Sequence, residues 1–163
     1  MLVSTFTLGD IYLGINIRMV REINRSAECT PVPGSPDYIR GMLNIRGRVI
    51  TLFDIGIRLG WSKQDPGAGK VKQYNVIMKT RDEVSKIDNN LAMTQCPWED
   101  PVGLIVDQLG DVLDIPDDNI LPPPANLTGI SVDFIQGVVT FEQNLLVILD
   151  IATVLGLNDQ ASS

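Results

Sequence analysis

One pattern of apolar and polar positions occurs twice along this chain. Residues 38–60 and 134–156 align without a gap when one segment is shifted by 96 positions. Six pairs of identical residues mark the alignment: Ile39, Gly41, Asp54, Ile55, Leu59 and Gly60 match Ile135, Gly137, Asp150, Ile151, Leu155 and Gly156. A match of this length without an insertion predicts two copies of one structural unit.

Each copy predicts a β-hairpin that leads into a short helix. Two apolar runs of strand length are separated by a short polar break in each copy, which is typical of a hairpin. Gly41 and Gly137 stand at the entry to the first run, where we expect structural glycines at a permissive backbone position. Asp54 and Asp150 follow the second run, and each precedes an apolar turn that ends at a glycine. We therefore predict that these two aspartates are helix N-caps.

The flanking sequence extends the duplication. Residues 5–17 alternate apolar and polar positions around Gly9-Asp10, which predicts a further hairpin. Residues 102–112 echo residues 13–23 at an offset of 89. A proline-containing loop follows in both halves, and its prolines exclude a central strand. The predicted fold is therefore mainly β, with two similar five-stranded β-barrel subdomains and short helices.

We expect a single domain made of these two subdomains. The first covers approximately residues 1–62, a polar connector covers 63–72, the second covers approximately 73–158, and 159–163 form a tail. Residues 80–101 are polar and irregular, and they are too many for an ordinary hairpin connection. We predict a surface insertion there, mobile in part, which Trp98 pins to the protein.

Composition restricts the classes of function. Hydrophobic residues make up 44% of the chain and charged residues 20%, as in ordinary folded proteins. The apolar runs have strand length, so we predict no insertion into a membrane. The N-terminus lacks the pattern of a signal peptide, which favours a cytoplasmic protein with Cys29 and Cys96 unpaired. A net charge of −7 disfavours nucleic-acid binding.

Few residues are available for catalysis, because the chain has no histidine. This excludes Ser-His-Asp and Cys-His sites and removes the commonest zinc ligand. A catalytic pair of Asp54 and Asp150 is disfavoured, because the repeat places the two in different barrels with the same capping role. The acidic residues at 111–118 lack the spacing of a calcium loop, and Gly67–Lys70 lacks that of a phosphate-binding loop. The sequence predicts no enzyme, no cofactor and no metal site.

One difference between the two copies points to binding. Residues 44–47 read Asn-Ile-Arg-Gly at the turn of the first hairpin, whereas residues 140–143 read Thr-Phe-Glu-Gln. The shared fold therefore does not require Arg46. An arginine on a tight turn presents a planar fork of donors to a partner, although it could also merely solvate the turn. We interpret Arg46 as a partner-binding residue.

Six segments together resemble the CheW family of bacterial chemotaxis coupling proteins. They are FTLGD at 6–10, VREI at 20–23, YIRGMLNIRG at 38–47, VITLFDI at 49–55, VGLIVD at 102–107 and ILDI at 148–151. They cover both halves of the chain in the order of the family. Two features depart from the family: Thr51 replaces the usual proline, and the insertion at residues 80–101 is longer than in a typical member.

The resemblance implies a non-enzymatic adaptor. Members of the family bind the cytoplasmic tip of a chemoreceptor and the regulatory domain of a CheA-type histidine kinase, within receptor arrays at the inner face of the membrane. Glu22, Arg46 and Gly47 match family positions that serve receptor and array contacts, and we expect Val20 to line the same groove between the subdomains. The kinase-facing surface is expected among the exposed apolar residues of the barrels.

Two alternatives to this function stay open. The chain could be a CheW-like scaffold in a related pathway, such as twitching motility or second-messenger control. It could also be a small-molecule-binding or hydrolytic double barrel that uses Asp107 or Asp54.

Overall fold

The computed structural model describes residues 1–25, 28–60, 73–125 and 129–157, and within these ranges it is mainly β. The expected connector at 63–72 and the expected tail at 159–163 lie outside the described residues. In the described part of the chain, no helix has both the length and the apolar character needed to cross a bilayer.

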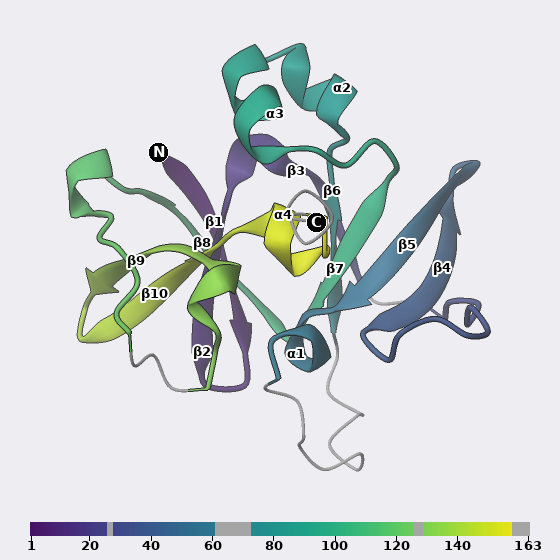
Figure 1. Ribbon diagram of the computed structural model, residues 1–163, viewed down its shortest axis with the longest axis horizontal. Helices are drawn as coiled ribbons and strands as arrows, with labels where there is room; N and C mark the ends of the chain where they lie inside the picture. The colour runs from purple at the N-terminus through teal and green to yellow at the C-terminus, as the bar shows by residue number, and fades with distance from the viewer. Residues whose placement is uncertain (26–27, 61–72, 126–128, 158–163) are drawn as a thin grey trace.

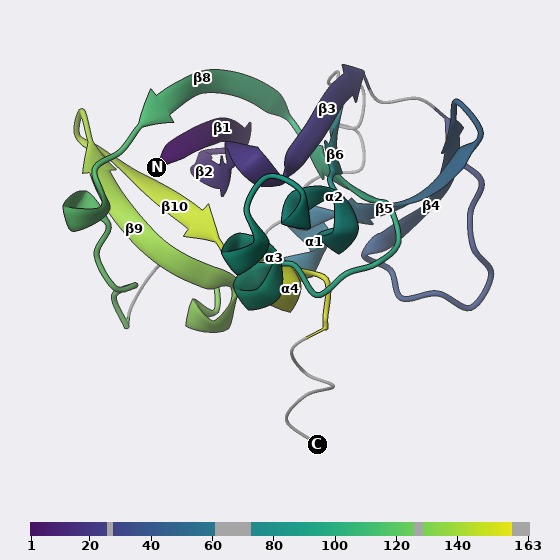
Figure 2. The same cartoon turned by 90° about the horizontal axis from the view of Figure 1, so that it is seen from above.

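Two five-stranded sheets lie side by side, with α4 (Ile151–Val154) between them (Figures 1 and 2). The first sheet has the order β8 (Gln108–Asp114), β1 (Leu2–Leu8), β2 (Ile11–Asn16), β10 (Asn144–Leu149) and β9 (Ile135–Phe141). The second has the order β3 (Val20–Arg25), β6 (Tyr74–Met78), β7 (Val102–Val106), β5 (Arg48–Asp54) and β4 (Ile39–Ile45). The other helical segments are α1 (Ile55–Arg58), α2 (Arg81–Ser85), α3 (Asn89–Gln95), η1 (Ile17–Met19), η3 (Asp117–Asn119) and η4 (Val132–Phe134).

Each sheet takes strands from both halves of the chain. The strands β1 and β2 lie in one sheet with β8, β9 and β10, while β3, β4 and β5 share the other sheet with β6 and β7. The strand β2 is bonded on both sides, by β1 and by β10, so the next strand cannot add beside it and crosses to the other sheet. The strand β7 is enclosed in the same way by β6 and β5, and the chain crosses back to β8. The expected division at residues 63–72 therefore does not separate the two sheets.

The prediction of a mainly β fold with two five-stranded units is confirmed, but the prediction of closed barrels is wrong. In the described residues the ladders end at β8 and β9 in one sheet and at β3 and β4 in the other. The segments beside β9 and β4 form one bridge each, from Leu121 to Val138 and from Thr30 to Met42. Three prolines follow each bridge, at 122–124 and at 31, 33 and 36. Because proline has no N–H to donate, these segments cannot continue the ladder that would close a barrel.

The repeated glycines make room for these bridges. A Cβ atom at Gly41 would lie 2.4 Å from the carbonyl oxygen of Thr30. At Gly137 it would lie 2.6 Å from Cγ2 of Ile120 and 3.1 Å from the oxygen of Leu121. At both positions the neighbouring chain approaches closer than any side chain would allow.

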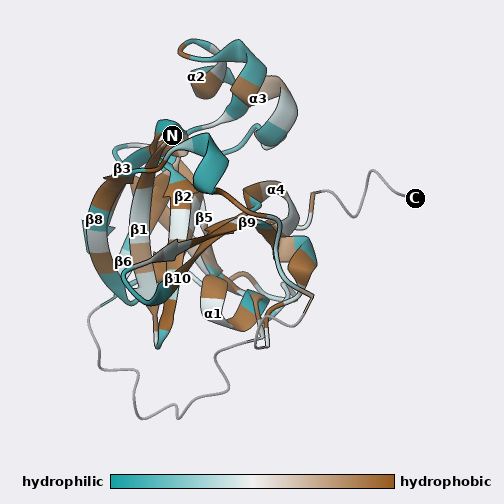
Figure 3. Ribbon diagram, turned by 90° about the vertical axis from the view of Figure 1, so that its left-hand side faces the viewer, coloured by the Kyte–Doolittle hydropathy of each residue, from teal (hydrophilic) through white to brown (hydrophobic). Residues whose placement is uncertain are grey.

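The main core lies between the sheets and takes residues from both. Phe6 and Leu13 of the first sheet, Val76 and Leu104 of the second, and Ile55 of α1 are among its buried members. A smaller apolar cluster is enclosed by each sheet on its other face. The inner strands are therefore buried on both faces, which explains the nearly continuous apolar sequence of β7 and β10. The apolar character of β10 is visible in Figure 3.

Arg58 joins the two copies of the repeat. Its Nε donates to the carbonyl oxygen of Val154 at 2.8 Å, and its Nη2 donates to that of Thr153 at 3.1 Å. Its guanidinium carbon lies 4.7 Å from the ring centre of Tyr38 and 5.0 Å from that of Phe134. Tyr38 and Phe134 begin the two repeated segments, and Val154 is the repeat position of Arg58 itself. One side chain thus connects α1 to the carboxyl end of α4.

The insertion at residues 80–101 is a packed helical hairpin, which corrects the prediction of an irregular segment. Thr80 begins α2 with a capping box to Glu83, and Asp88 caps α3 by accepting from the backbone N–H of Leu91 at 3.0 Å. The side chains of Val84, Leu91 and Cys96 are buried in the main core. Trp98 is 4% exposed and donates its Nε1–H to the oxygen of Lys79 at 2.6 Å, so the predicted pinning by Trp98 is confirmed.

Candidate functional site

The β4–β5 hairpin presents Arg46 and Gly47 at its tip. Ile45 pairs with Arg48, which leaves a two-residue loop, and the φ angles of Arg46 and Gly47 are 51° and 83°. Two positive φ angles in such a loop are characteristic of a type I′ turn, whose twist suits a hairpin. Asn44 steadies the turn, because its Oδ1 accepts the N–H of Gly47 at 3.0 Å. The Arg46 side chain is 69% exposed.

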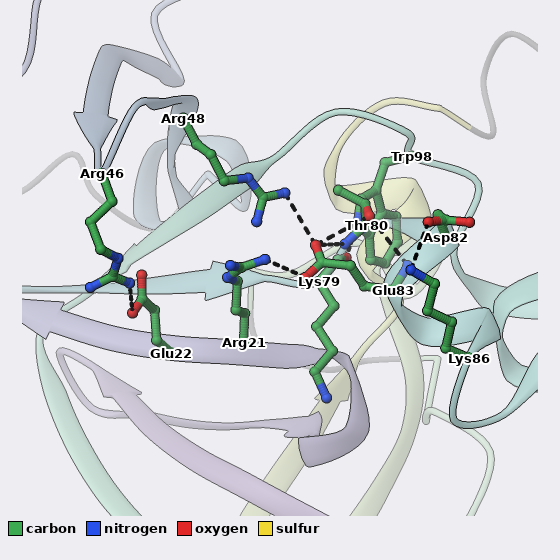
Figure 4. Close-up of polar contacts among 10 residues, drawn as sticks. All are labelled: Arg21, Glu22, Arg46, Arg48, Lys79, Thr80, Asp82, Glu83, Lys86 and Trp98. Carbon is green, nitrogen blue, oxygen red and sulfur yellow. Dashed lines mark hydrogen bonds and ion pairs between the residues drawn. The ribbon is translucent and has the colours of Figure 1, made fainter.

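Glu22 reaches Arg46 across the open side of the second sheet. Glu22 lies on β3 and Arg46 follows β4, and these are the two end strands of that sheet. Arg46 Nη2 nevertheless donates to Glu22 Oε2 and forms an ion pair with it, as Figure 4 shows. The sheet must therefore curl until its ends approach. The ion pair between Glu22 and Arg46 therefore joins two strands that would be joined by backbone hydrogen bonds in a closed barrel.

Val20 occupies a different environment from these three residues. It begins β3, is half-buried and packs against the main apolar cluster. The pairing of β3 with β6 shifts register between Val20 and Glu22. The structure thus brings Glu22, Arg46 and Gly47 together. Val20 is the first residue of β3, the strand that also carries Glu22.

A second bridge beside this pair was missed by the sequence reasoning. Glu83 of α2 forms ion pairs with Arg21 of β3 and with Arg48 of β5, the latter at 3.2 Å between Nη2 and Oε1. Arg21 adjoins Glu22, and Arg48 is two residues from Arg46, so the two bridges run side by side (Figure 4). The Thr80-x-x-Glu83 pattern could have indicated a helix start, but no local pattern indicates the two arginines.

The charge of Glu83 is stabilised by its neighbours. Its burial would raise the pKa of the carboxyl, but hydrogen bonds from Arg21 and Thr80 and the charge of Arg21 outweigh this effect. The pKa of Glu83 therefore lies below its ordinary value of 4.5. Because the folded pKa is the lower one, the stabilising contribution of this ionised group is present above the ordinary value. It is lost as the pH falls through the lowered pKa.

Asp54 and Asp150 are the N-caps of α1 and α4. Oδ1 of Asp54 accepts the N–H of Ile57 at 3.1 Å, and Oδ1 of Asp150 accepts that of Thr153 at 3.3 Å. The two lie at the ends of strands in different sheets. Asp54 also pairs with Arg40. These contacts give both carboxylates a local structural task.

Asp107, considered above for a hydrolytic site, also binds neighbouring chain segments. Its Oδ2 accepts the N–H of Gly9 at 2.8 Å, and its Oδ1 accepts Nε2 of Gln73 at 3.2 Å. It thereby holds the turn between β1 and β2 beside the end of β7.

Comparison with known proteins bears on this geometry. The family model of the CheW-like domain matches residues 3–158. A probable chemotaxis protein CheW from Rhizobium etli is 29% identical over 146 residues, which cover 90% of this chain and 81% of that protein. The chemotaxis protein CheW of Rhizobium meliloti is 28% identical over 149 residues, covering 91% of this chain and 83% of that protein.

A solved structure agrees with the fold as well. The crystal structure of the scaffolding protein TtCheW from Thermoanaerobacter tengcongensis superposes with a TM-score of 0.74 at 26% identity, over 94% of this chain and 86% of that one. Since the family model covers nearly the whole chain and both sheets, the chain belongs to the CheW family of chemotaxis coupling and scaffold proteins.

Proposed function

We propose that this chain is a non-enzymatic adaptor that couples the cytoplasmic tip of a chemoreceptor to the regulatory domain of a CheA-type histidine kinase. It would act in the cytoplasm, in receptor arrays at the inner face of the membrane. The observation that supports this role most is the exposed Arg46, presented on a two-residue turn and oriented by Glu22. In this proposal Glu22, Arg46 and Gly47 form the receptor-binding site, with Val20 at its base.

The physical basis is association between surfaces that are already ordered. Arg46 contributes one hydrogen bond to Glu22, and a guanidinium group has five N–H donors. Its 69% exposure leaves most of the fork accessible to an acidic or carbonyl-rich partner surface. Gly47 adds no side chain to the tip, and in the described residues nothing lies within 4 Å of the place where its Cβ would be. A partner can therefore approach the turn closely.

Exposed apolar side chains are our candidates for the kinase contact. Met42 and Val49 of the β4–β5 hairpin are 42% and 54% exposed, and Leu145 of β10 is 40% exposed. Leu145 is the repeat position of Val49, so each sheet presents an apolar residue at the same place. Apolar side chains of this kind supply affinity, while the charged pair sets orientation and partner choice.

The decisive experiment is a titration of a receptor cytoplasmic fragment with the wild-type chain and with Arg46→Glu. We expect Arg46→Glu to fold normally and to bind at least about tenfold more weakly, the effect of ~1.4 kcal/mol. Lys86→Glu is the matched control, because it makes the same change of charge at a side chain that is 73% exposed. Unchanged affinity of folded Arg46→Glu would contradict the assignment.

Exchanging the charges of Glu22 and Arg46 distinguishes a role of Arg46 in recognising the partner from a role in holding the hairpin. The double variant Glu22→Arg/Arg46→Glu can re-form an ion pair across the same gap, but it presents the opposite charge to a partner. We expect it to restore stability without restoring affinity. Full recovery of affinity would show that Arg46 only holds the hairpin.

Coupling itself requires the kinase. Activity of a CheA-type kinase with receptor fragments should rise on addition of the wild-type chain and should not rise with Arg46→Glu. The same contacts would serve in twitching motility or second-messenger control, and parallel assays with receptors and kinases of each pathway would identify the one served.

A further inference from the structure

The helical insertion reaches the candidate receptor site through one carboxylate. Two charge bridges span the open side of the second sheet, Glu22 with Arg46 and Glu83 with both Arg21 and Arg48. In Figure 4 they lie side by side between β3 and the β4–β5 hairpin. The second bridge ties together three separate segments: an end strand, the hairpin that carries Arg46, and α2.

Glu83 is itself firmly held. Its Oε1 accepts the backbone N–H and the hydroxyl of Thr80, both at 3.2 Å, within the capping box of α2. The next residue, Val84, is fully buried in the main core, and Trp98 anchors the end of the insertion to Lys79. A carboxylate fixed in this way differs from an ordinary surface glutamate, because little side-chain freedom remains to be lost when it pairs.

We propose that Glu83 is a positioning residue of the receptor site: by pairing with Arg21 and Arg48 it sets the separation between β3 and the hairpin tip that presents Arg46. This inference rests on the proposed receptor-binding role of Arg46. Without Glu83, Arg21 and Arg48 would face each other across the gap as like charges. The hairpin would then sample more positions, and binding would have to order it again.

The first test uses the free protein and needs no partner. Glu83→Gln keeps the shape of the side chain but removes its charge. We expect faster hydrogen exchange of the backbone amides at Gly47 and Arg48 in Glu83→Gln than in the wild type. Glu99→Gln is the control, since Glu99 pairs with Arg81 in the same insertion, is 71% exposed and has no part in the bridges. Equal exchange at the hairpin tip in all three proteins would overturn the positioning role.

The second test measures receptor affinity. We expect Glu83→Gln to weaken binding about tenfold, a typical size for coupling between neighbouring residues. In a background of Arg46→Ala the same change should have almost no effect, because Glu83 acts through Arg46. An equal loss in both backgrounds would show a separate role for Glu83 and would overturn the proposal.

Folding of the insertion needs its own control, because Glu83 also caps α2. The double variant Arg21→Gln/Arg48→Gln breaks the same bridge and leaves the capping box intact. We expect it to reproduce both the faster exchange and the weaker binding of Glu83→Gln. A wild-type result for this double variant would reduce Glu83 to a helix cap. If Arg46→Glu binds normally while the exchange results hold, the receptor role fails and the positioning of the hairpin stands.

Discussion

Arg58 is the side chain whose removal most directly tests how the two repeats are held together. In Arg58→Ala the carbonyls of Thr153 and Val154 lose the hydrogen bonds that Arg58 donates, and the rings of Tyr38 and Phe134 lose a cation. A hydrogen bond from a charged donor contributes about 1.5 kcal/mol, and a cation–π contact at a partly exposed site contributes ~0.5 kcal/mol. Because neighbouring contributions overlap, we expect a total loss of about 2–4 kcal/mol in the free energy of unfolding.

The assay is urea denaturation followed by far-ultraviolet circular dichroism. With a slope of about 2 kcal/mol per molar urea, the midpoint should fall by about 1–2 M. Arg58→Lys keeps the charge but has a point-like ammonium group in place of a planar fork, so we expect about half of that loss. Lys86→Ala is the control, because the ion pair of Lys86 with Asp82 is highly exposed, so its loss should change stability by less than about 0.5 kcal/mol. A midpoint for Arg58→Ala as high as that of Lys86→Ala would refute this account of how the repeats are joined.

Two further predictions concern the close packing at the β4 edge of the second sheet and the buried thiol of Cys96. Gly41→Ala should lower the free energy of unfolding by about 3 kcal/mol in denaturation, because the added methyl would lie 2.4 Å from the oxygen of Thr30. In the control Gly34→Ala, nothing lies within 4 Å of the added methyl, so the loss should be only the ~1 kcal/mol of a left-handed backbone. Equal losses in the two variants would contradict the steric argument. Burial raises the pKa of Cys96 from 9.0 to about 11, so a thiol reagent should modify only Cys29 in the native protein at pH 8. The stability of the native protein should fall as the pH rises from about 9 towards 11, because the Cys96 thiol ionises first in the unfolded chain.

The repeat was predictable because its signals are local. A glycine before an apolar run, a two-residue polar break and an Asp at the strand end each specify geometry over a few residues. The hairpins 39–54 and 135–149 accordingly have the predicted order, and Asp54 and Asp150 cap the helices that follow.

The helices of the insertion were harder to predict because they are short. With 5 and 7 residues, α2 and α3 are too brief to show a helical period, and isolated helices of that length do not form without tertiary packing. The informative signals were the caps Thr80 and Asp88, each three residues before a backbone N–H that it accepts. Polar composition alone concealed the buried side chains of Val84 and Leu91.

The exchange of strands between the two halves has no local signal at all. The apolar patterns of β3 and β8 would suit either sheet, and only the enclosure of β2 and β7 on both sides decides which sheet each following strand joins. The contact between Glu22 and Arg46 depends on that exchange, because it joins the end strands of one sheet. Sequence reasoning therefore selected both residues separately, without indicating that they meet.

The exchange also explains how a duplicated fold can carry a single candidate site. The first sheet ends in β8 and β9, which are the repeat equivalents of β3 and β4. The repeat relates Glu22 to Asp111 of β8 and Arg46 to Glu142 of the β9–β10 turn. Both of these side chains are acidic and exposed, so at the equivalent place like charges replace the ion pair. The first sheet also has no counterpart of the α2–α3 insertion, because its central hairpin β1–β2 turns within the two residues Gly9 and Asp10. The duplication thus supplies two similar frames. The charged residues 22, 46 and 83 then make the edge of the second sheet a defined, pre-ordered surface. The equivalent edge of the first sheet carries like charges instead.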